Sequence, residues 1–453
     1  MSADPARQPL LPPPAHADSN GAHAHPQQDS SRKRFLKTLG IGVLVLLLTA
    51  ALLSSITDWP FSSGSPSSPG KHERRKPVAE ASHPPDVDGE VIACYPHQSG
   101  LDFHDTHRRW KDTALSGARA RTARATIDFP LDLSQVVNFI ARGGAVEGTV
   151  VIEDANSSNA TARVEVEWDP SMITKSPYLF EVCELYHYSR GAHVLGLYLP
   201  EWAKTAPRQF TPTQVVLTIS VPPGLVKSLR TETWLYTHDL RVSNKTTFSN
   251  VDLNSYYREI SGQLSGESLA LRSVNAPISG NYTASRKLSL HTSNAAIDTQ
   301  LVLGSSSVTV PTLNIGTTHG SISGAVRLVD AHSFDGVLRT TDAGIDFALA
   351  TLPLNGKVTL DAQTSNAPAR LALPATYEGV IVQSATGGGM PELTVPLMKD
   401  PAGLGRLHEV ATVSHGKHNR TDRVSWGPVG GRGKVTLGTS NAAAGVDITE
   451  NWK

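Results

Sequence analysis

Aspartates that stand next to isoleucines are the side chains whose spacing could support catalysis or metal binding. Asp298 and Asp346 each follow an isoleucine, and Asp447 precedes one, in runs where apolar and polar residues alternate. Two carboxylates on one exposed face could act as general acid and base on a glycosidic bond, or could bind calcium. The alternation favours a different interpretation, in which they are the outward, polar positions of strands. The distances among these residues and Asp361 decide between the two, and we expect no catalytic residue.

Two histidine-rich segments could hold a metal ion. Their candidate ligands are Asp102, His104, Asp105 and His107 in DFHDTH, and the pair His415 and His418. Both segments lack a third ligand at a defined spacing. The two cysteines of the chain are too few for an iron–sulfur cluster or an all-thiolate zinc site. The sequence therefore predicts no metal and no cofactor.

Composition narrows the classes of function further. The 453 residues include 41 basic and 41 acidic side chains, so no net field attracts nucleic acid. The charged fraction is 18%, below the roughly 25% typical of soluble globular chains, and there are 37 Gly and 30 Pro. This composition favours strands and turns over long surface helices. The chain also lacks the alternating β and α patterns of a nucleotide-binding domain.

The N-terminal segment predicts a membrane anchor. Residues 1–34 are rich in Pro, Ala, His and Gln, which indicates a disordered tail. A run of 20 uncharged, mostly apolar residues follows from Thr38 to Thr57, long enough as a helix to cross a bilayer. Because the preceding tail is too long for a cleaved signal peptide, residues 35–57 are predicted to form a signal-anchor helix. Residues 58–89 are rich in Ser and Pro and are expected to form a stalk.

Flanking charge predicts the orientation of this anchor. The basic cluster RKRFLK directly precedes the span, and a second basic cluster, KHERRK, lies about 15 residues beyond it. The closer cluster favours a cytosolic N-terminus and an extracellular or lumenal C-terminal domain, as in a type II single-pass protein. Five glycosylation sequons follow the span: Asn156, Asn159, Asn244, Asn281 and Asn419.

A repeat dominates the C-terminal half. The segments LALRSVNAPI, LSLHTSNAAI, LNIGTTHGSI, GVLRTTDAGI, LDAQTSNAPA and VTLGTSNAAA align without gaps. Each has a polar turn residue preceded by hydroxyl side chains and followed by Ala or Gly. The turn residues are Asn275, Asn294, His319, Asp342, Asn366 and Asn441. A degenerate copy is centred on Thr386, and successive turn residues are then 19, 25, 23, 24, 20 and 55 apart.

This period predicts an all-β β-solenoid, a β-helix-like stack of short strands. Apolar residues six and four positions before the turn residue, and three after it, would point into a shared core. The turn residue would form a structural corner, because Asn tolerates the left-handed conformation and can bond to its equivalent one rung away. A β-sandwich, in which each Asn-Ala is a hairpin turn, is the alternative.

The strand-rich region before the repeat is less regular. We expect an N-terminal β region at residues 90–230 and the repeat domain at 231–453, although VNFIARGGAV also fits the repeat frame around Gly143. Cys94 and Cys183 both lie in the first region. In a secretory lumen they are expected to form a disulfide, and two buried free thiols are the alternative.

An anchor, a stalk and repeats such as TSNAAI and TSNAPA resemble fungal single-pass membrane proteins whose ectodomains are similar to the adhesin-like β-helix group. The resemblance covers residues 265–450 well and 90–265 loosely. Its bacterial members carry a TSNGDI-like repeat, from which this chain departs by having Ala where Gly is usual, as at Ala295 and Ala367. The resemblance implies a displayed, adhesive fold.

Two functions of different classes follow. The first is a non-catalytic, adhesin-like ectodomain displayed at the cell surface or in the secretory lumen. Its expected partners are the lipid bilayer and a cell-wall glycan or another surface protein, with no nucleic acid. The alternative is a membrane-anchored enzyme that hydrolyses or cleaves glycans, like β-helix hydrolases and lyases. We expect the first.

Overall fold

A computed structural model describes residues 84–98, 111–114, 123–142, 147–168, 178–198, 214–304, 309–387, 389–427 and 431–450. These residues all belong to one compact unit, 77–453. They form 27 strands and two short 3-10 turns, so the all-β prediction is confirmed. Among them there is no helix long and apolar enough to cross a membrane. The predicted tail 1–34, the predicted span 35–57 and stalk residues 58–83 lie outside the described residues.

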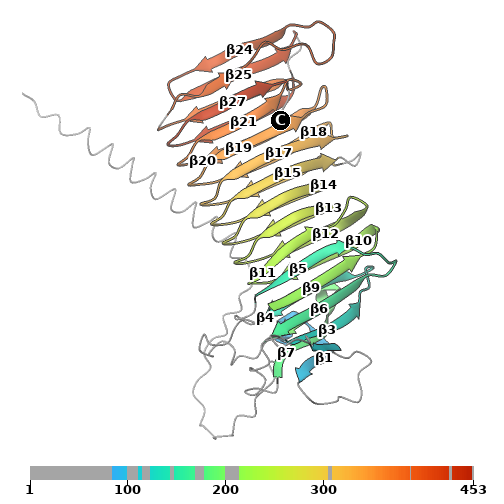
Figure 1. Cartoon of the computed structure of the whole chain (residues 1–453). Coiled ribbons are helices and arrows are strands. Elements are labelled where there is room, and N and C mark those ends of the chain that lie inside the picture. Colours follow the sequence, from blue (N-terminus) through green and yellow to red (C-terminus); the bar gives the residue numbers. More distant parts are fainter. Residues whose placement is uncertain are drawn as a thin grey trace, which may run out of the picture. The chain divides into compact units, whose positions relative to one another are not determined.

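Parallel strands form two columns through the repeat region (Figure 1). We call them column A and column B. Column A contains β10 (Gly224–Glu232), β12 (Thr246–Asn254), the C-terminal halves of β13 (Ile260–Arg272) and β14 (Ile278–His291), β16 (Thr312–Gly316), β18 (Ser333–Arg339) and β20 (Lys357–Thr364). Column B contains β11 (Tyr236–Arg241), the N-terminal halves of β13 and β14, β15 (Ile297–Gly304), β17 (Ile322–Val329), β19 (Ile345–Thr351) and β21 (Ala369–Pro374). One strand of column A, a corner and one strand of column B make a rung, and each corner holds one turn residue of the repeat.

The register of the rungs follows the apolar frame of the sequence. In column B one position is filled in successive rungs by Ile260, Ile278, Ile297, Ile322, Ile345, Ala369 and Ala444. All seven are at most 2% exposed, so the predicted inward direction of this position is confirmed. Burying one isoleucine contributes roughly 2–3 kcal/mol. A slip by one residue would expose the whole line, which fixes the register.

Glycines two residues after this position have a steric reason. Gly262 and Gly280 have φ of 120° and 128°, and they lie opposite each other in β13 and β14. A Cβ at Gly280 would be 2.0 Å from the carbonyl oxygen of Gly262. Only glycine fits both the conformation and the space, which explains the repeated Ile-Ser-Gly sequence.

The order of rungs in space departs from their order in sequence at both ends. Near the C-terminus, β26 (Gly433–Thr439) and β27 (Ala444–Thr449) lie between β20 and β21 on one side and β22 (Gly379–Ala385) and β23 (Glu392–Thr394) on the other. Near the N-terminus, β4 (Val136–Arg142) and β5 (Glu147–Asp154) lie between β10 and β11 and the later strands β8 (Ala192–Tyr198) and β9 (Gln214–Val221). The first part of the frame proposed around Gly143 belongs to the stack, because Val137 and Phe139 of β4 are buried in it, whereas Gly143 itself lies outside the described residues. The segment around Thr386 forms the last rung but is one residue out of the predicted frame: Ile381 pairs with Val435, which puts Gly387 at the corner position of Asn441.

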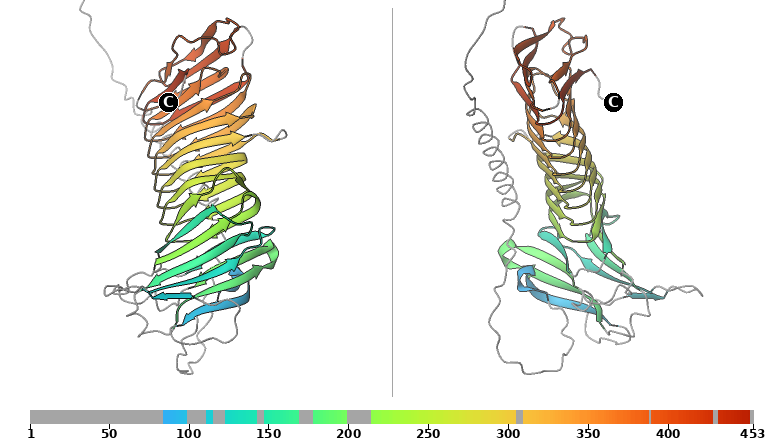
Figure 2. Two further views of the ribbon diagram at one scale, coloured as in Figure 1. Left: turned by 45° about the vertical axis from the view of Figure 1, so that its right-hand side comes forward. Right: turned by 90° about the vertical axis from the view of Figure 1, so that its left-hand side faces the viewer.

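Antiparallel strands close the two ends (Figure 2). At the first end, β7 (Tyr178–His187) and β1 (Glu90–Gln98) extend column A. Column B is extended there by β6 (Thr161–Trp168), β3 (Ala123–Pro130) and β2 (Lys111–Ala114). At the other end β25 (Asn419–Trp426) and β24 (His408–His415) extend column A, and they come from the 55-residue gap in the repeat.

One hydrophobic core joins the two expected regions. It extends from Ala125 to Ile448, and β10 crosses the expected boundary at residue 230. The pairing of β12 to β21 is parallel, whereas Asn-Ala hairpins of the sandwich alternative would pair successive strands antiparallel. At the first end the expected stalk stops before residue 84, because Asp86–Asp88 form a 3-10 turn whose Asp88 is buried.

Candidate functional site

The six turn residues form a continuous hydrogen-bonded ladder along one edge of the stack, which we call the corner edge. Its members, all exposed, are Asn275, Asn294, His319, Asp342, Asn366 and Asn441. Asn294 Nδ2 donates to Asn275 Oδ1 at 2.6 Å, and Asn294 Oδ1 faces His319 Nδ1 at 3.0 Å. His319 Nε2 lies 3.2 Å from Asp342 Oδ2. Asn366 Nδ2 donates to Asp342 Oδ1 at 2.6 Å, and Asn441 Nδ2 to Asn366 Oδ1 at 2.7 Å.

Backbone bonds repeat at each corner. The N–H of Asn294 donates to the carbonyl of Val274 one rung below, and the Thr292 hydroxyl donates to the carbonyl of Ala276. The same two bonds recur at His319 and Thr317. These bonds explain the hydroxyl residue that stands two positions before each turn residue.

The left-handed conformation expected of the turn residues is wrong. Among the described residues, positive φ outside glycine occurs at Asp330 and Asn355, and neither is a turn residue. Asn is selected at the corner because its amide can donate to one neighbouring rung and accept from the other.

Three aromatic residues continue the corner edge beyond Asn275. Trp234 and Tyr256 occupy equivalent corner positions of consecutive rungs, and Tyr257 follows Tyr256. The Trp234 and Tyr256 rings are nearly parallel, 5.1 Å apart at 15°, and the Tyr256 and Tyr257 rings are 4.8 Å apart at 61°. They are 48%, 38% and 49% exposed, respectively. We call these residues the aromatic corner.

Backbone and charged groups hold the aromatic corner in place. Tyr257 N–H donates to Trp234 O at 3.0 Å, and Asn275 N–H donates to Tyr256 O at 3.0 Å. Arg258 forms an ion pair with Glu147, and both side chains are about half exposed. These backbone bonds hold the aromatic corner rigidly and connect it to the polar ladder. The ion pair beside it carries no net charge.

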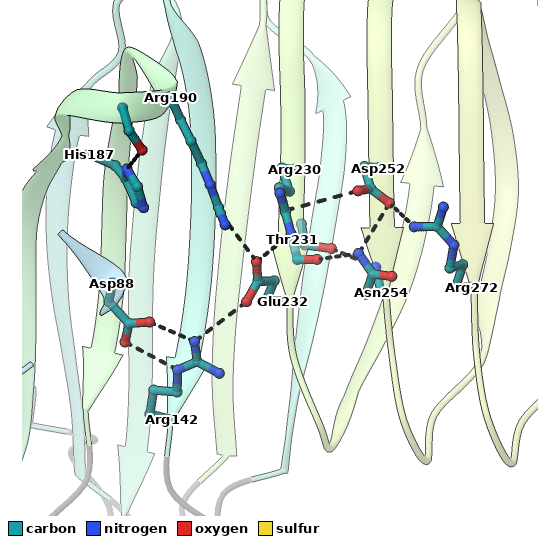
Figure 3. Close-up of polar contacts among 11 residues, drawn as sticks. Asp88, Arg142, His187, Arg190, Arg230, Thr231, Glu232, Asp252, Asn254 and Arg272 are labelled. Carbon is teal, nitrogen blue, oxygen red and sulfur yellow. Dashed lines mark hydrogen bonds and ion pairs between the residues drawn. The ribbon is translucent and has the colours of Figure 1, made fainter. Parts of the chain in front are cut away.

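A line of alternating charges lies on the outer face of column A at the first end (Figure 3). It contains Asp88, Arg142, Glu232, Arg190, Arg230, Asp252 and Arg272. Arg142 Nη2 lies 2.6 Å from Asp88 Oδ1 and 3.4 Å from Glu232 Oε2. Asp88 also accepts a hydrogen bond from the Tyr198 hydroxyl at 3.1 Å.

This network has a structural role at its buried end. Asp88 is 1% exposed, so its carboxylate needs Arg142 and Tyr198 as partners, and it fixes residues 84–89 against β4 and β8. The Cys94–Cys183 disulfide lies nearby, between directly opposed residues of β1 and β7, as the sequence predicts. Its two sulfurs and a carboxylate oxygen of Glu181 are spaced like the ligands of a metal ion. Sulfurs that are joined in a disulfide are not thiolates, however, and so are not free to bind a metal.

A shallow depression of about 630 Å³ lies on the outer face of column B, over β5, β6, β9 and β11. Its charged side chains have partners. Arg163 is paired with Asp128 and Arg241 with Asp239, while Glu153 accepts from Ser220 at 3.3 Å. The depression is thus a concave part of the sheet surface in which each arginine is neutralised by an aspartate.

The aspartates considered as acid and base do not converge. Asp298 and Asp346 are exposed at the same column B position, with Ser323 between them. Two strand spacings of about 4.8 Å place their backbones about 10 Å apart. Asp361 lies in column A and is paired with Arg339, and Asp447 lies opposite Ala372. These positions match the outward, polar interpretation.

The histidine-rich candidates are not brought together either. Asp102, His104, Asp105 and His107 lie outside the described residues. His415 is exposed in β24, and His418 Nδ1 lies 2.9 Å from the Ala385 carbonyl oxygen. In the part of the chain that the structure describes, neither belongs to a cluster of metal-ligand type.

The five sequons lie away from the aromatic corner. All five asparagines are exposed. Asn156 and Asn159 follow β5, and Asn244 follows β11, at the opposite edge, where Asp154 bonds Ser243 and Thr246 between the two loops. Asn281 faces outward from column B. Asn419 begins β25 opposite Ser384, at the corner end of the antiparallel strands that close the C-terminal end of the stack, which we call the C-terminal cap.

The repeat frame extends two rungs further than the sequence pattern indicated. Tyr257 and Leu235 occupy the turn position, with Ile260 and His238 at the inward position. The aromatic corner was missed because the frame was defined by polar turn residues. The apolar residues Val251 and Leu253, six and four positions before Tyr257, are the signal that could have found it.

This chain has structural matches among known proteins but no sequence-family match. No family model matches this chain, and no curated protein matches its sequence. Three crystal structures each match 72% of it. A proposed cell adhesion protein from Clostridium sporogenes is 7% identical, covered over 100% of its length, with a TM-score of 0.16. A proposed lipid-binding protein from Parabacteroides distasonis is 8% identical, covered over 96%, with a TM-score of 0.28. A proposed adhesin from Bacteroides fragilis is 11% identical, covered over 97%, with a TM-score of 0.23. At these scores the similarities carry no argument about function.

Proposed function

We propose that this chain is a non-catalytic, adhesin-like β-solenoid displayed outside the cytosol on a type II membrane anchor. In this proposal residues 1–34 are cytosolic, residues 35–57 cross the bilayer, and the stack is extracellular or lumenal. The uncharged run from Thr38 to Thr57 and its basic flank support the anchor.

The observation that carries the proposal is the distribution of the sequons and the aromatic corner. All five sequon asparagines are exposed and lie away from the aromatic corner, which presents three partly exposed rings. Glycans at those asparagines would cover the opposite edge, column B and the C-terminal cap, and would leave the aromatic corner free. A bare aromatic surface on a glycosylated stack suits a surface that meets a partner. The disulfide also suits an oxidising compartment.

Topology is tested on the full-length chain in a eukaryotic cell with a tag at Met1. We expect the tag to be accessible from the cytosol and endoglycosidase to lower the apparent mass. The control replaces the five sequon asparagines by Gln, which should abolish the mass shift. A protected tag, or no glycan on the unaltered chain, would contradict the orientation.

Adhesion is tested with lipid vesicles that carry the full-length chain. We expect them to bind intact cells of the source organism more than protein-free vesicles do. Equal binding of both vesicle types would contradict the adhesive role, whatever the topology.

A further inference from the structure

We propose that the aromatic corner, Trp234, Tyr256 and Tyr257, is a binding site for an uncharged oligosaccharide. The inference rests on the proposed display of the stack outside the cytosol and names the chemistry of its partner. It differs from the enzyme alternative because no bond of the glycan is broken.

The exposed rings have the chemistry that a sugar ring needs. A pyranose presents C–H groups on one face and hydroxyls around its rim, so it packs its C–H face on an aromatic ring while its hydroxyls seek polar groups. Trp and Tyr combine a large apolar surface with a polar tip. At the aromatic corner the Arg258–Glu147 ion pair and the exposed Asn275 amide lie beside the rings and can exchange hydrogen bonds with those hydroxyls.

The size of the surface favours a glycan over a protein. Three aromatic side chains exposed by 48%, 38% and 49% leave on the order of 300 Å² available. A stable protein interface takes about 800 Å² from each partner. A few sugar rings match the smaller area, and the neighbouring asparagine ladder could extend the contact along the corner edge.

The charges favour a neutral ligand. Arg258 is already paired with Glu147, and the next residue, Glu259, is exposed and acidic. An acidic glycan would find no unpaired cation among these flanking residues and would be repelled by Glu259. An uncharged oligosaccharide meets neither difficulty.

Order at the site also supports binding. The rings are packed on one another, and backbone bonds connect their rungs, so little conformational freedom remains to be lost when a ligand arrives. Glycans at the five sequons would not cover the aromatic corner, so it stays accessible in the glycosylated chain.

The test measures binding of hexasaccharides of β-linked glucose, of N-acetylglucosamine, of mannose and of galacturonic acid to the full-length chain in mild detergent. We expect at least one neutral hexasaccharide to bind and the acidic galacturonate to bind more weakly. Trp234→Ala combined with Tyr256→Ala should lower the affinity at least tenfold. Tyr188→Ala removes an aromatic side chain that is 73% exposed and lies off the corner edge, so this matched control should leave binding unchanged.

A second measurement needs no variant and so does not depend on the double variant folding. The bound hexasaccharide should slow the oxidation of Trp234 by N-bromosuccinimide in the unaltered chain, as read by peptide mass spectrometry. No binding by any neutral hexasaccharide, equal binding by the double variant, tighter binding of galacturonate, or unprotected Trp234 would each overturn the proposal. Vesicles that adhere to cells while no hexasaccharide binds would overturn this site but leave the adhesive function standing, with a protein partner in place of a glycan.

Discussion

The middle of the stack and its two ends bury their apolar faces and strand edges by different means. From β12 to β19 each rung pairs with the rung that precedes it in sequence and the one that follows, and the same inward and corner positions recur. At the ends the rung order is exchanged, antiparallel strands take over, and a disulfide and a buried ion pair appear. A middle rung has two neighbours to bury its faces and strand edges, whereas a terminal rung has one. The difference teaches that repetition builds the stack and specific contacts close it.

The largest expected effect comes from breaking the middle. Ile297 is fully buried with Ile278 and Ile322 on either side, so Ile297→Asp would bury a carboxylate with no partner in the apolar column. We expect a loss of roughly 5 kcal/mol in the free energy of unfolding. Denaturant unfolding of the full-length chain measures it.

The neighbouring residue provides the control for this prediction. Asp298 is exposed, so Asp298→Ala should change the free energy of unfolding by less than about 0.5 kcal/mol. If the two changes proved equally damaging, the assignment of faces would be inverted, and Asp298 would again be a candidate for chemistry.

The next effect concerns the first end. Cys94 and Cys183 are 89 residues apart in sequence, and removing their disulfide by Cys94→Ser with Cys183→Ser frees a long loop in the unfolded chain. The chain-entropy model predicts a loss of about 4.6 kcal/mol for a loop of that length. The loss of stability should be greatest at the first end of the stack, so hydrogen exchange should rise in β1 and β7 while β14 and β15 stay protected. Uniform loss of protection along the stack would contradict the separation of end and middle.

Acid should destabilise the rung of β10 and β11, where the middle of the stack meets its first end. His238 occupies the inward column beside Ile260, is fully buried, and bonds Thr231 Oγ1 through Nε2 at 2.7 Å. Burial lowers the pKa of His238 from 6.5 to about 4. Below pH 6.5 the unfolded chain therefore binds a proton that the folded chain refuses, so stability is full above pH 6.5 and falls as the pH drops toward 4.

The loss from His238 should reach about 3 kcal/mol near pH 4. His238→Ile extends the isoleucine column and should flatten this part of the pH dependence. His291, whose pKa is lowered to about 4 by burial and then by Arg272 and Lys287, contributes a further loss with the same sign in both proteins. Denaturant unfolding at pH 7 and at pH 4.5 gives the comparison, and an unchanged pH dependence in the variant would contradict the role of His238.

The smallest effect lies in the ladder. Asn294→Ala removes two exposed side-chain bonds, to Asn275 and to His319, while the backbone bonds of the corner remain. We expect a loss of about 1 kcal/mol. Thermal unfolding can resolve it, and Asn355→Ala, outside the ladder, is not a matched control because Asn355 has a positive φ. The better control is Asn314→Ala, which removes an exposed asparagine of β16 that is neither a ladder member nor a sequon and should have a smaller effect.

The middle of the stack could be predicted from sequence because its rules are local and repeat. The apolar residues around Asn294 and His319 define the inward positions, and the register then follows from burying them together. The exchanged rungs could not be predicted. By its pattern of apolar residues β26 fits beside β20 and beside β22 equally well, and only packing between segments far apart in sequence determines the order of the rungs. The aromatic corner was hidden for a different reason, since Tyr257 and Leu235 are not the polar turn residues that defined the frame.

The exchanged rung order near the C-terminus also has a consequence in time. A chain synthesised from its N-terminus releases β22 some 54 residues before β26 (379 to 433), although β26 must end up between β20 and β22. At 5–20 residues per second this delay is on the order of 3–10 s. During it, the edge of β20 at Leu360 and the edge of β22 at Ile381, which both pair with Val435 of β26 in the finished stack, are open to each other. Closing this end is therefore a late event in the life of each molecule, in which a newly released rung must be inserted between two strands that were available to each other first.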